Sequence, residues 1–181
     1  MFFTCYSLMT LEKLLYSSKP NYIKFVKKEK KRYKFFNKGQ FLEIKGKIAE
    51  KYVNYWLKNF SNIKFPKNNI EINSSYSYNL KNNNYLFYKN NNLIFELDNL
   101  IIYNKKYYPI EVKSGKLNGF SKKIPKIIKN VKNIFDNFGY MLVFIPFRTY
   151  DKKKQFKNIE KNYKNKIKFI NLDDKIKNNL K

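Results

Sequence analysis

The chain contains no histidine and only one cysteine, Cys5. A single cysteine excludes an internal disulfide and a zinc site built from several cysteines. The lack of histidine excludes His-dependent acid–base catalysis, Ser/His/Asp and Cys/His nucleophile systems, and metal sites with imidazole ligands. Any hydrolytic chemistry must therefore use carboxylates, lysine and a hard, oxygen-binding ion such as Mg²⁺.

Acidic residues are also scarce, because 13 Asp and Glu stand against 39 Lys and Arg, which gives a net charge of +26. Such an excess of positive charge predicts a polyanionic partner, most simply nucleic acid. The alternative is that an AT-rich coding sequence enriches Lys, Asn, Ile, Tyr and Phe without any function. That bias does not account for acids placed opposite each other.

Long apolar runs are missing as well, since none approaches the ~20 residues of a membrane-spanning helix. The starting segment MFFTCYSLMTLEKLL lacks a basic leader and contains Glu12, so no signal peptide is expected. We therefore expect an intracellular, cytoplasmic protein with no membrane partner. At 181 residues, 43% of them hydrophobic and 19% aromatic, the chain is long enough for one well-cored domain.

The spacing of apolar residues predicts helices mixed with strands. Helices are expected over 7–16, 41–60 and 121–138, the last with Pro125 in its first turn and Gly139 at its end. Strands are expected over 69–79, 85–88, 93–103, 106–113, 140–145 and 166–171, with a final helix from Asp173. This order predicts an α/β core over 41–146, a basic N-terminal helical extension over 1–40 and a basic C-terminal extension over 147–181.

One expected hairpin contains most of the residues that indicate a chemical function. Its strands flank Asn104-Lys105, and Asn tolerates the positive φ that a two-residue turn needs. In that register Asp98 faces Glu111, whereas a three-residue turn would separate the two acids. Directly opposed side chains lie roughly 5 Å apart. Two carboxylates at that distance repel by about 3 kcal/mol at an effective dielectric constant near 20, so the arrangement predicts a bound cation.

The same hairpin supplies further groups for metal chemistry. Lys113 shares the face of Glu111 because side chains alternate along a strand, and the carbonyl of Val112 can act as a metal ligand. In phosphodiester hydrolysis a metal offsets phosphate charge and lowers the pKa of an attacking water, while a lysine positions that water. Alternatively, Lys113 is the cross-strand partner of Glu96, which the same register places opposite it.

These residues resemble the PD-(D/E)XK nuclease superfamily. Asp98 and the strand Glu111-Val112-Lys113 match the metal-binding acid and the E-x-K strand of the family. Gly46 and Glu50 match the G-x-x-x-E pattern of its first core helix. Leu97 stands where the family name has proline. The helix expected over 121–138 contains no Q-x-x-x-Y, which disfavours the RecB-like exonuclease branch. The resemblance covers about residues 41–146.

The resemblance implies a restriction-endonuclease-like αβββαβ core, with a central mixed sheet flanked by helices. It implies that Asp98, Glu111 and Glu50 bind Mg²⁺ or Mn²⁺ and that Lys113 is catalytic, although Glu43 on a neighbouring helix face competes with Glu50. Lysines near the site are expected to contact phosphates: Lys116, Lys122, Lys123 and Lys126.

The implied function is a metal-dependent nuclease, with DNA as the favoured substrate and an endonuclease or junction-resolvase mode. Such nucleases often act as dimers, so a homodimer is a further expectation. Two alternatives stay open: a catalytically inactive nucleic-acid-binding module of the same fold, and an effector that cleaves RNA.

Overall fold

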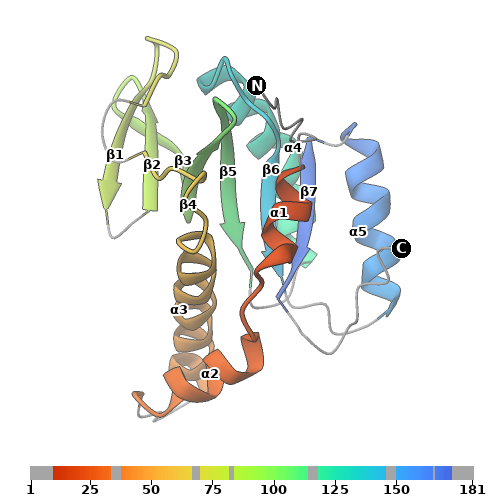
Figure 1. The fold of residues 1–181 in the computed structure, drawn as a ribbon. Coiled ribbons are helices and arrows are strands. Elements are labelled where there is room, and N and C mark those ends of the chain that lie inside the picture. The colour runs from red at the N-terminus through yellow and green to blue at the C-terminus, as the bar shows by residue number, and fades with distance from the viewer. Residues whose placement is uncertain are drawn as a thin grey trace, which may run out of the picture.

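The computed structural model describes residues 10–33, 38–66, 70–81, 84–113, 118–145, 150–164 and 166–172. Within these ranges the chain forms five helices and two sheets in a mixed α/β arrangement (Figure 1). The helices are α1 (Leu11–Ser17), α2 (Tyr22–Lys30), α3 (Lys38–Leu57), α4 (Asn118–Ile134) and α5 (Tyr150–Asn162). No helix in the described ranges is long and apolar enough to cross a lipid bilayer.

The larger sheet has four strands in the order β4 (Asn99–Tyr103), β5 (Lys106–Val112), β6 (Met141–Ile145) and β7 (Ile167–Asn171). β4 and β5 are antiparallel, whereas β5, β6 and β7 are parallel. Alternate residues of β6 face opposite hydrophobic clusters, one shared with α1 and α3 and the other with α4 and α5. Helices therefore cover both faces (Figure 1), which confirms the expected central mixed sheet flanked by helices.

The cluster on the α1 and α3 face contains Trp56, which is fully buried. Its Nε1 donates a hydrogen bond to the carbonyl of Leu15 at 2.9 Å, and its ring packs edge-on against Phe144. Leu11 and Leu15 of α1 belong to this cluster, as do Ile170 and Leu172 at the other end of the described chain. The core thus includes residues on both sides of 41–146.

The smaller sheet is antiparallel and contains β1 (Ser77–Lys81), β2 (Asn84–Lys89) and β3 (Asn92–Leu97). The strand expected over 69–79 is mostly wrong, because residues 70–76 are irregular and Asn69 lies outside the described residues. In that segment Asn73 donates its N–H to the carbonyl of Ile134 at the end of α4, and Ser75 donates to the Asn73 side chain. Five strands lie between α3 and α4, whereas the αβββαβ core implied by the resemblance has three there.

The turn between β4 and β5 fixes the register of the larger sheet. Asn104 and Lys105 have φ values of 48° and 61°. A two-residue hairpin turn of type I′ requires a positive φ at both central residues. The pairs run from Asn99 opposite Ile110 to Tyr103 opposite Lys106, which confirms the expected register.

Several element boundaries differ from the expectation. α1 begins at Leu11, after an N-cap at Thr10, and α4 ends at Ile134, well before Gly139. Gly139 instead donates its N–H to the carbonyl of Tyr107, and a Cβ there would lie 2.5 Å from the Tyr108 ring. β6 and β7 confirm the strands expected over 140–145 and 166–171. α5 was not expected, and the helix expected from Asp173 lies outside the described residues.

Candidate active site

Asp98 lies where the chain passes from one sheet to the other. The strand expected over 93–103 is broken there, because β3 pairs with β2 and β4 pairs with β5. The chain joins the larger sheet only at Asn99, so no residue of β4 lies opposite Val112 to accept a hydrogen bond from its N–H. This N–H donates to Asp98 Oδ2 at 2.6 Å. The carboxylate of Asp98 is thereby fixed beside the end of β5.

Glu111 and Lys113 lie at that end of β5 on one face, as the strand period predicts. The N–H of Lys113 donates to the carbonyl of Phe144 in β6 at 2.9 Å, so the backbone of Lys113 is held although β5 ends at Val112. The structure therefore brings together Asp98, Glu111 and Lys113. The N–H and C=O of one residue of an extended strand point to the same side, so we expect the Val112 carbonyl on the side of Asp98.

Glu111 is the most strongly perturbed acid of the group. Its residue is only 5% exposed, and burial followed by the negative charge of Asp98 raises its pKa to about 7. Burial also raises the pKa of Asp98, against the opposing effects of Lys113 and of the hydrogen bond from Val112. Two carboxylates whose charged forms are both disfavoured are a feature of sites that receive a cation.

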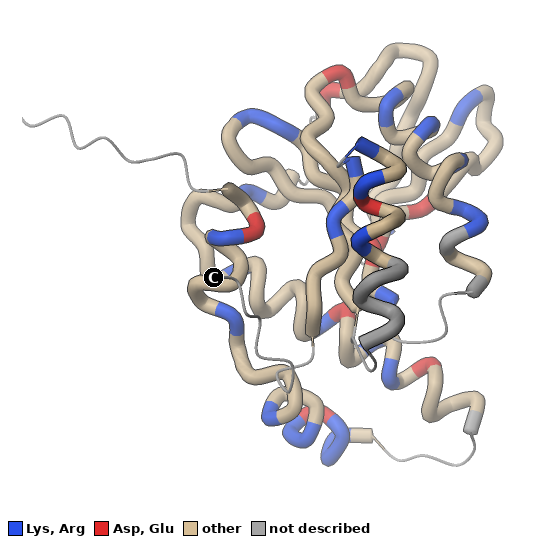
Figure 2. The backbone as a smooth tube through the Cα atoms, turned by 90° about the vertical axis from the view of Figure 1, so that its right-hand side faces the viewer, with Lys and Arg blue, Asp and Glu red and all other residues tan. Residues whose placement is uncertain are grey.

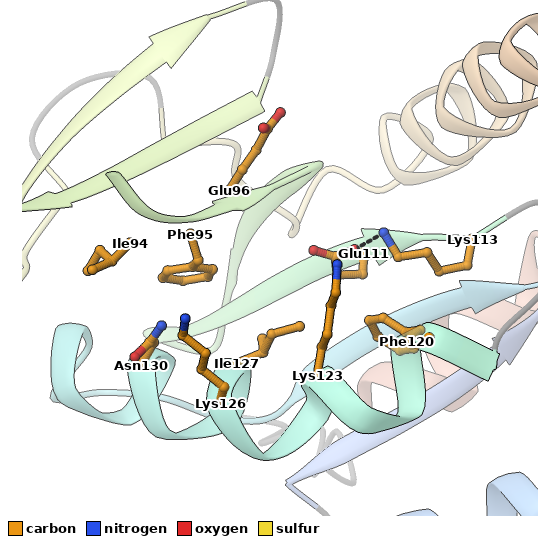
Figure 3. Close-up of a pocket in the computed structure, with 11 residues that line it drawn as sticks. Ile94, Phe95, Glu96, Glu111, Lys113, Phe120, Lys123, Lys126, Ile127 and Asn130 are labelled. Atoms are coloured by element: carbon orange, nitrogen blue, oxygen red, sulfur yellow. Dashed lines mark ion pairs between the residues drawn. The ribbon is translucent and has the colours of Figure 1, made fainter. Parts of the chain in front are cut away.

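Lys113 forms an ion pair with Glu111 Oε2 (Figure 3). Burial alone would lower the pKa of the lysine, but the charges of Glu111 and Asp98 outweigh burial and raise it, so the ammonium form persists. Its Nζ also lies 5.4 Å from the centre of the Phe120 ring at the start of α4. A fixed ammonium group next to two acids is thus part of the site.

Glu50 on α3 is half-buried and close enough to interact electrostatically with Asp98 and Lys113. Burial and the charge of Asp98 raise its pKa, while Lys113 opposes them. Glu43, by contrast, is exposed and pairs with Lys47 one turn along the helix at 2.5 Å. Of the two helix acids considered, Glu50 is the one that the fold directs to the site.

Glu96 is exposed and belongs to β3, where its Oε1 accepts a hydrogen bond from Asn84 Nδ2 at 2.5 Å. No ion pair joins Glu96 to Lys113 within the described chain, so the expected cross-strand pair is wrong. The physical reason is the break at Asp98, which assigns Glu96 to the smaller sheet. Glu96 still lies at the rim of the site, and its charge contributes to the raised pKa values of Asp98 and Glu111.

The donor set fits a hard divalent cation. Glu111 Oε2 is buried, and among the described residues its partner is the Lys113 ammonium. No three Asp, Glu or Cys side chains of the described residues lie close enough together to hold a metal ion among them. Mg²⁺ is commonly held by one or two carboxylates together with waters and substrate phosphate, and Asp98 and Glu111 are of that kind.

A cleft of about 570 Å³ opens in front of Glu111 and Lys113, between β3 and α4 (Figure 3). We call it the β3–α4 cleft. Its described lining is Ile94, Phe95, Glu96, Glu111, Lys113, Gly119, Phe120, Lys123, Lys126, Ile127 and Asn130. Of the lysines expected to contact phosphates, Lys123 and Lys126 therefore line this cleft. Lys122 is exposed on α4 outside the lining, and Lys116 lies outside the described residues.

The distribution of charge does not mark one surface of the described chain. Lys and Arg are spread over helices and loops around the molecule, while Asp and Glu are few (Figure 2). The sequence pattern predicted site roles for Lys123 and Lys126, which line the cleft, but not for Phe95 and Asn130, which line it as well. Lys123, Lys126 and Asn130 are spaced so that they share one face of a helix, and this spacing could have indicated Asn130. The pairing of β3 with β2, which places Phe95 opposite α4, has no comparable sign in the sequence.

Comparisons with known proteins identify no relative: no protein-family model matches the chain, and neither a curated protein nor a solved structure does. The interpretation of the site therefore depends on its geometry and chemistry.

Burial of Glu111 predicts a measurable dependence of stability on pH in EDTA. Its folded-state pKa of about 7 lies above the ordinary 4.5, so this group favours the folded state below pH 4.5 and loses that contribution as pH rises through 7. Glu111→Gln is therefore expected to match the wild type near pH 4 and to be more stable at pH 8, by about 3 kcal/mol at most. Urea unfolding at both pH values measures this.

The matched control is Glu96→Gln, an acid-to-amide change at an exposed side chain of the same cleft. Its free energy of unfolding relative to the wild type is expected to be nearly the same at pH 4 and pH 8. If the difference in free energy of unfolding between the wild type and Glu111→Gln does not change with pH, the raised pKa of the buried Glu111 carboxyl is contradicted.

Proposed function

We propose that the chain is a metal-dependent nuclease that hydrolyses phosphodiester bonds of nucleic acid, with DNA as the favoured substrate. The observation that carries the proposal is the group at the end of β5, where the buried Glu111 and the half-buried Asp98 have raised pKa values around one ammonium group. This group faces a cleft lined by lysines of α4. The chain has no histidine, so these are the groups available for such chemistry.

The roles follow from where the atoms lie. Asp98, Glu111 and the Val112 carbonyl would hold Mg²⁺ or Mn²⁺, and Glu50 would orient water at the same ion. When bound, such an ion lowers the pKa of a coordinated water and offsets phosphate charge. Lys113 keeps its ammonium form beside Glu111, so it can donate a hydrogen bond to the attacking water or to a phosphate oxygen. Lys123 and Lys126 attract the phosphates.

The proposal includes membership of the PD-(D/E)XK type. Supporting it are a helix with Glu50 before the strands, an acid at the entry of β4, an E-x-K sequence at the end of β5 and a mixed sheet between helices. The break of the sheet at Asp98 and the extra strands before it depart from the expected three-strand order. These two departures do not separate Asp98 from the E-x-K residues Glu111, Val112 and Lys113.

The experiment is incubation of the purified chain with labelled linear, single-stranded and branched DNA, and with RNA, in Mg²⁺, Mn²⁺ or EDTA. Cleavage is expected with either metal and is expected to vanish in EDTA, in Asp98→Ala and in Lys113→Ala. RNA cleavage that leaves every DNA intact would assign the chain to RNA instead. If no nucleic acid is cut with any metal, the nuclease proposal is wrong.

A non-catalytic nucleic-acid-binding module is the second candidate. The net charge of +26 and the direct ion pair between Lys113 and Glu111 favour it, because both exist without any cation. This candidate predicts binding that weakens steeply with salt and no cleavage in the same assay.

A further inference from the structure

The wall of the β3–α4 cleft formed by β3 has an unusual arrangement of apolar side chains. The register between β2 and β3 shifts after the pair Phe87 and Phe95, so that Tyr88 pairs with Leu93 and Ile94 is the extra residue. Successive side chains of a regular strand point to opposite faces, but a bulge re-aims them. Ile94 and Phe95 accordingly both line the cleft, facing α4 (Figure 3).

Phe95 is held in a fixed position. Its ring stacks on Phe87 with a centroid distance of 5.1 Å and an interplanar angle of 15°. Phe87 is fully buried and in turn packs edge-on against Phe135. Half-buried Phe95 thus presents a rigid aromatic surface to the cleft, and a flat ring can stack on such a surface at little cost in side-chain entropy.

Asn130 on the opposite wall has a polar atom without a partner. Its Nδ2 is buried and has no hydrogen-bond acceptor among the described residues. A buried donor left unpaired destabilises the fold, so its presence in a cleft wall is a reason to look for a ligand acceptor. Asn130 lies on the α4 wall near Lys126, across from Ile94 and Phe95 (Figure 3).

The charges at the cleft fit a strand of nucleic acid. Lys123 and Lys126 are exposed on the α4 side, and Glu111 and Lys113 lie at one end (Figure 3). A volume of about 570 Å³ lies within the usual range for small-molecule sites. The cleft therefore offers an aromatic surface, a hydrogen-bond donor and two cations beside the candidate catalytic groups.

We propose that the β3–α4 cleft holds an unpaired nucleobase of the substrate strand, stacked on Phe95 and accepting a hydrogen bond from Asn130 Nδ2, with Lys123 and Lys126 at the flanking phosphates. The inference rests on the proposed nuclease function and deepens it, because it selects single-stranded or unpaired segments over continuous duplex. A paired base is stacked between its neighbours and cannot offer its faces to Phe95.

Binding is measured with the full chain in EDTA, so that no strand is cut. The probes are a fluorescein-labelled single-stranded DNA, the same strand in a full duplex, and a single strand that carries 2-aminopurine. The wild type is expected to bind the single strand more tightly than the duplex at equal salt, and stacking is expected to quench the 2-aminopurine fluorescence.

Phe95→Leu keeps an apolar side chain but removes the aromatic face, and is expected to weaken single-strand binding by roughly five- to a hundredfold. It should leave duplex binding near the wild-type value. Asn130→Leu removes the unpaired donor at similar volume. It is expected to weaken single-strand binding while raising the melting temperature, whereas an asparagine with a purely structural role would lower that temperature when replaced.

Lys126→Ala is expected to weaken binding of both DNA forms and to reduce the dependence of affinity on salt. Its matched control is Lys129→Ala, an exposed lysine one turn along α4 that is outside the cleft lining. Single-strand affinity and 2-aminopurine quenching that stay at the wild-type level in both Phe95→Leu and Asn130→Leu would overturn the inference. Equal affinity of the wild type for single strand and duplex would overturn it as well.

Failure of the nuclease proposal is separable from failure of this inference. If the wild type cuts nothing with Mg²⁺ or Mn²⁺ but the two cleft variants lose single-strand binding, the base site is supported and the nuclease is not. If the wild type cuts DNA but the variants bind normally, the nuclease stands and the base site is wrong. If the wild type binds no nucleic acid, both are wrong.

Discussion

Replacing Glu111 with glutamine is expected to lower the rate of Mg²⁺-dependent DNA cleavage by roughly a thousandfold. The amide keeps the size of the side chain but loses the charge that a divalent cation and the Lys113 ammonium both require. Glu111 is buried at the end of β5, where the Asp98 and Lys113 side chains also lie. Initial rates at saturating Mg²⁺, compared between wild type and variant, measure the effect.

Glu96→Gln is the matched control for this loss. Glu96 lies at the rim of the same cleft, but it is exposed and its carboxylate is engaged by Asn84. The rate of this variant is expected to stay close to that of the wild type. If Glu96→Gln and Glu111→Gln lose the same activity, the loss comes from the charge of the cleft as a whole, which would contradict the role given to Glu111.

The second large effect is expected from Lys113→Met. Cleavage should fall by about 10²–10³-fold, because a donor directed at the reacting phosphate or water is lost. Lys113 also lowers the pKa of Glu111, which is about 7, so removal of Lys113 is expected to raise that pKa. Glu111 would then be protonated at neutral pH, and cation binding would have to displace the proton.

This second consequence is measurable without any substrate. Calorimetric titration with Mn²⁺ at pH 7 in two buffers of different ionisation enthalpy reports the protons released on binding. Lys113→Met is expected to release more protons per ion and to bind more weakly than the wild type. Lys129→Met, a change of the same kind at an exposed lysine of α4, should do neither. Unchanged proton release in Lys113→Met would contradict the coupling between Lys113 and Glu111.

Local sequence signals predicted the parts of the site that lie within one hairpin. The Asn104-Lys105 turn fixed the register of β4 and β5, and the strand period placed Glu111 and Lys113 on one face. The G-x-x-x-E pattern from Gly46 favoured Glu50, and in the structure Glu50 interacts with Asp98 and Lys113 whereas Glu43 pairs with Lys47. These predictions depend on contacts between residues that are near in sequence, where turn chemistry and periodicity decide the outcome.

The break of the sheet at Asp98 could not be predicted in this way. The residues from Leu93 to Tyr103 have a strand-like pattern throughout, and only the competing partner β2 draws β3 into another sheet. Because β3 pairs with β2, Glu96 lies in the smaller sheet away from Lys113, and Phe95 lies opposite α4. The irregular path of residues 70–76 has a non-local cause as well, since their backbone groups bond to the end of α4 and to each other.

The most direct test of the metal site is a titration with Mn²⁺ followed by electron paramagnetic resonance of the free ion. The wild type is expected to bind Mn²⁺ at a site that Mg²⁺ competes for, and Glu96→Gln is expected to keep that site. Asp98→Asn and Glu111→Gln are each expected to lose it. Mn²⁺ binding that is the same in Glu111→Gln as in the wild type would contradict the assignment of Asp98 and Glu111 as the metal ligands.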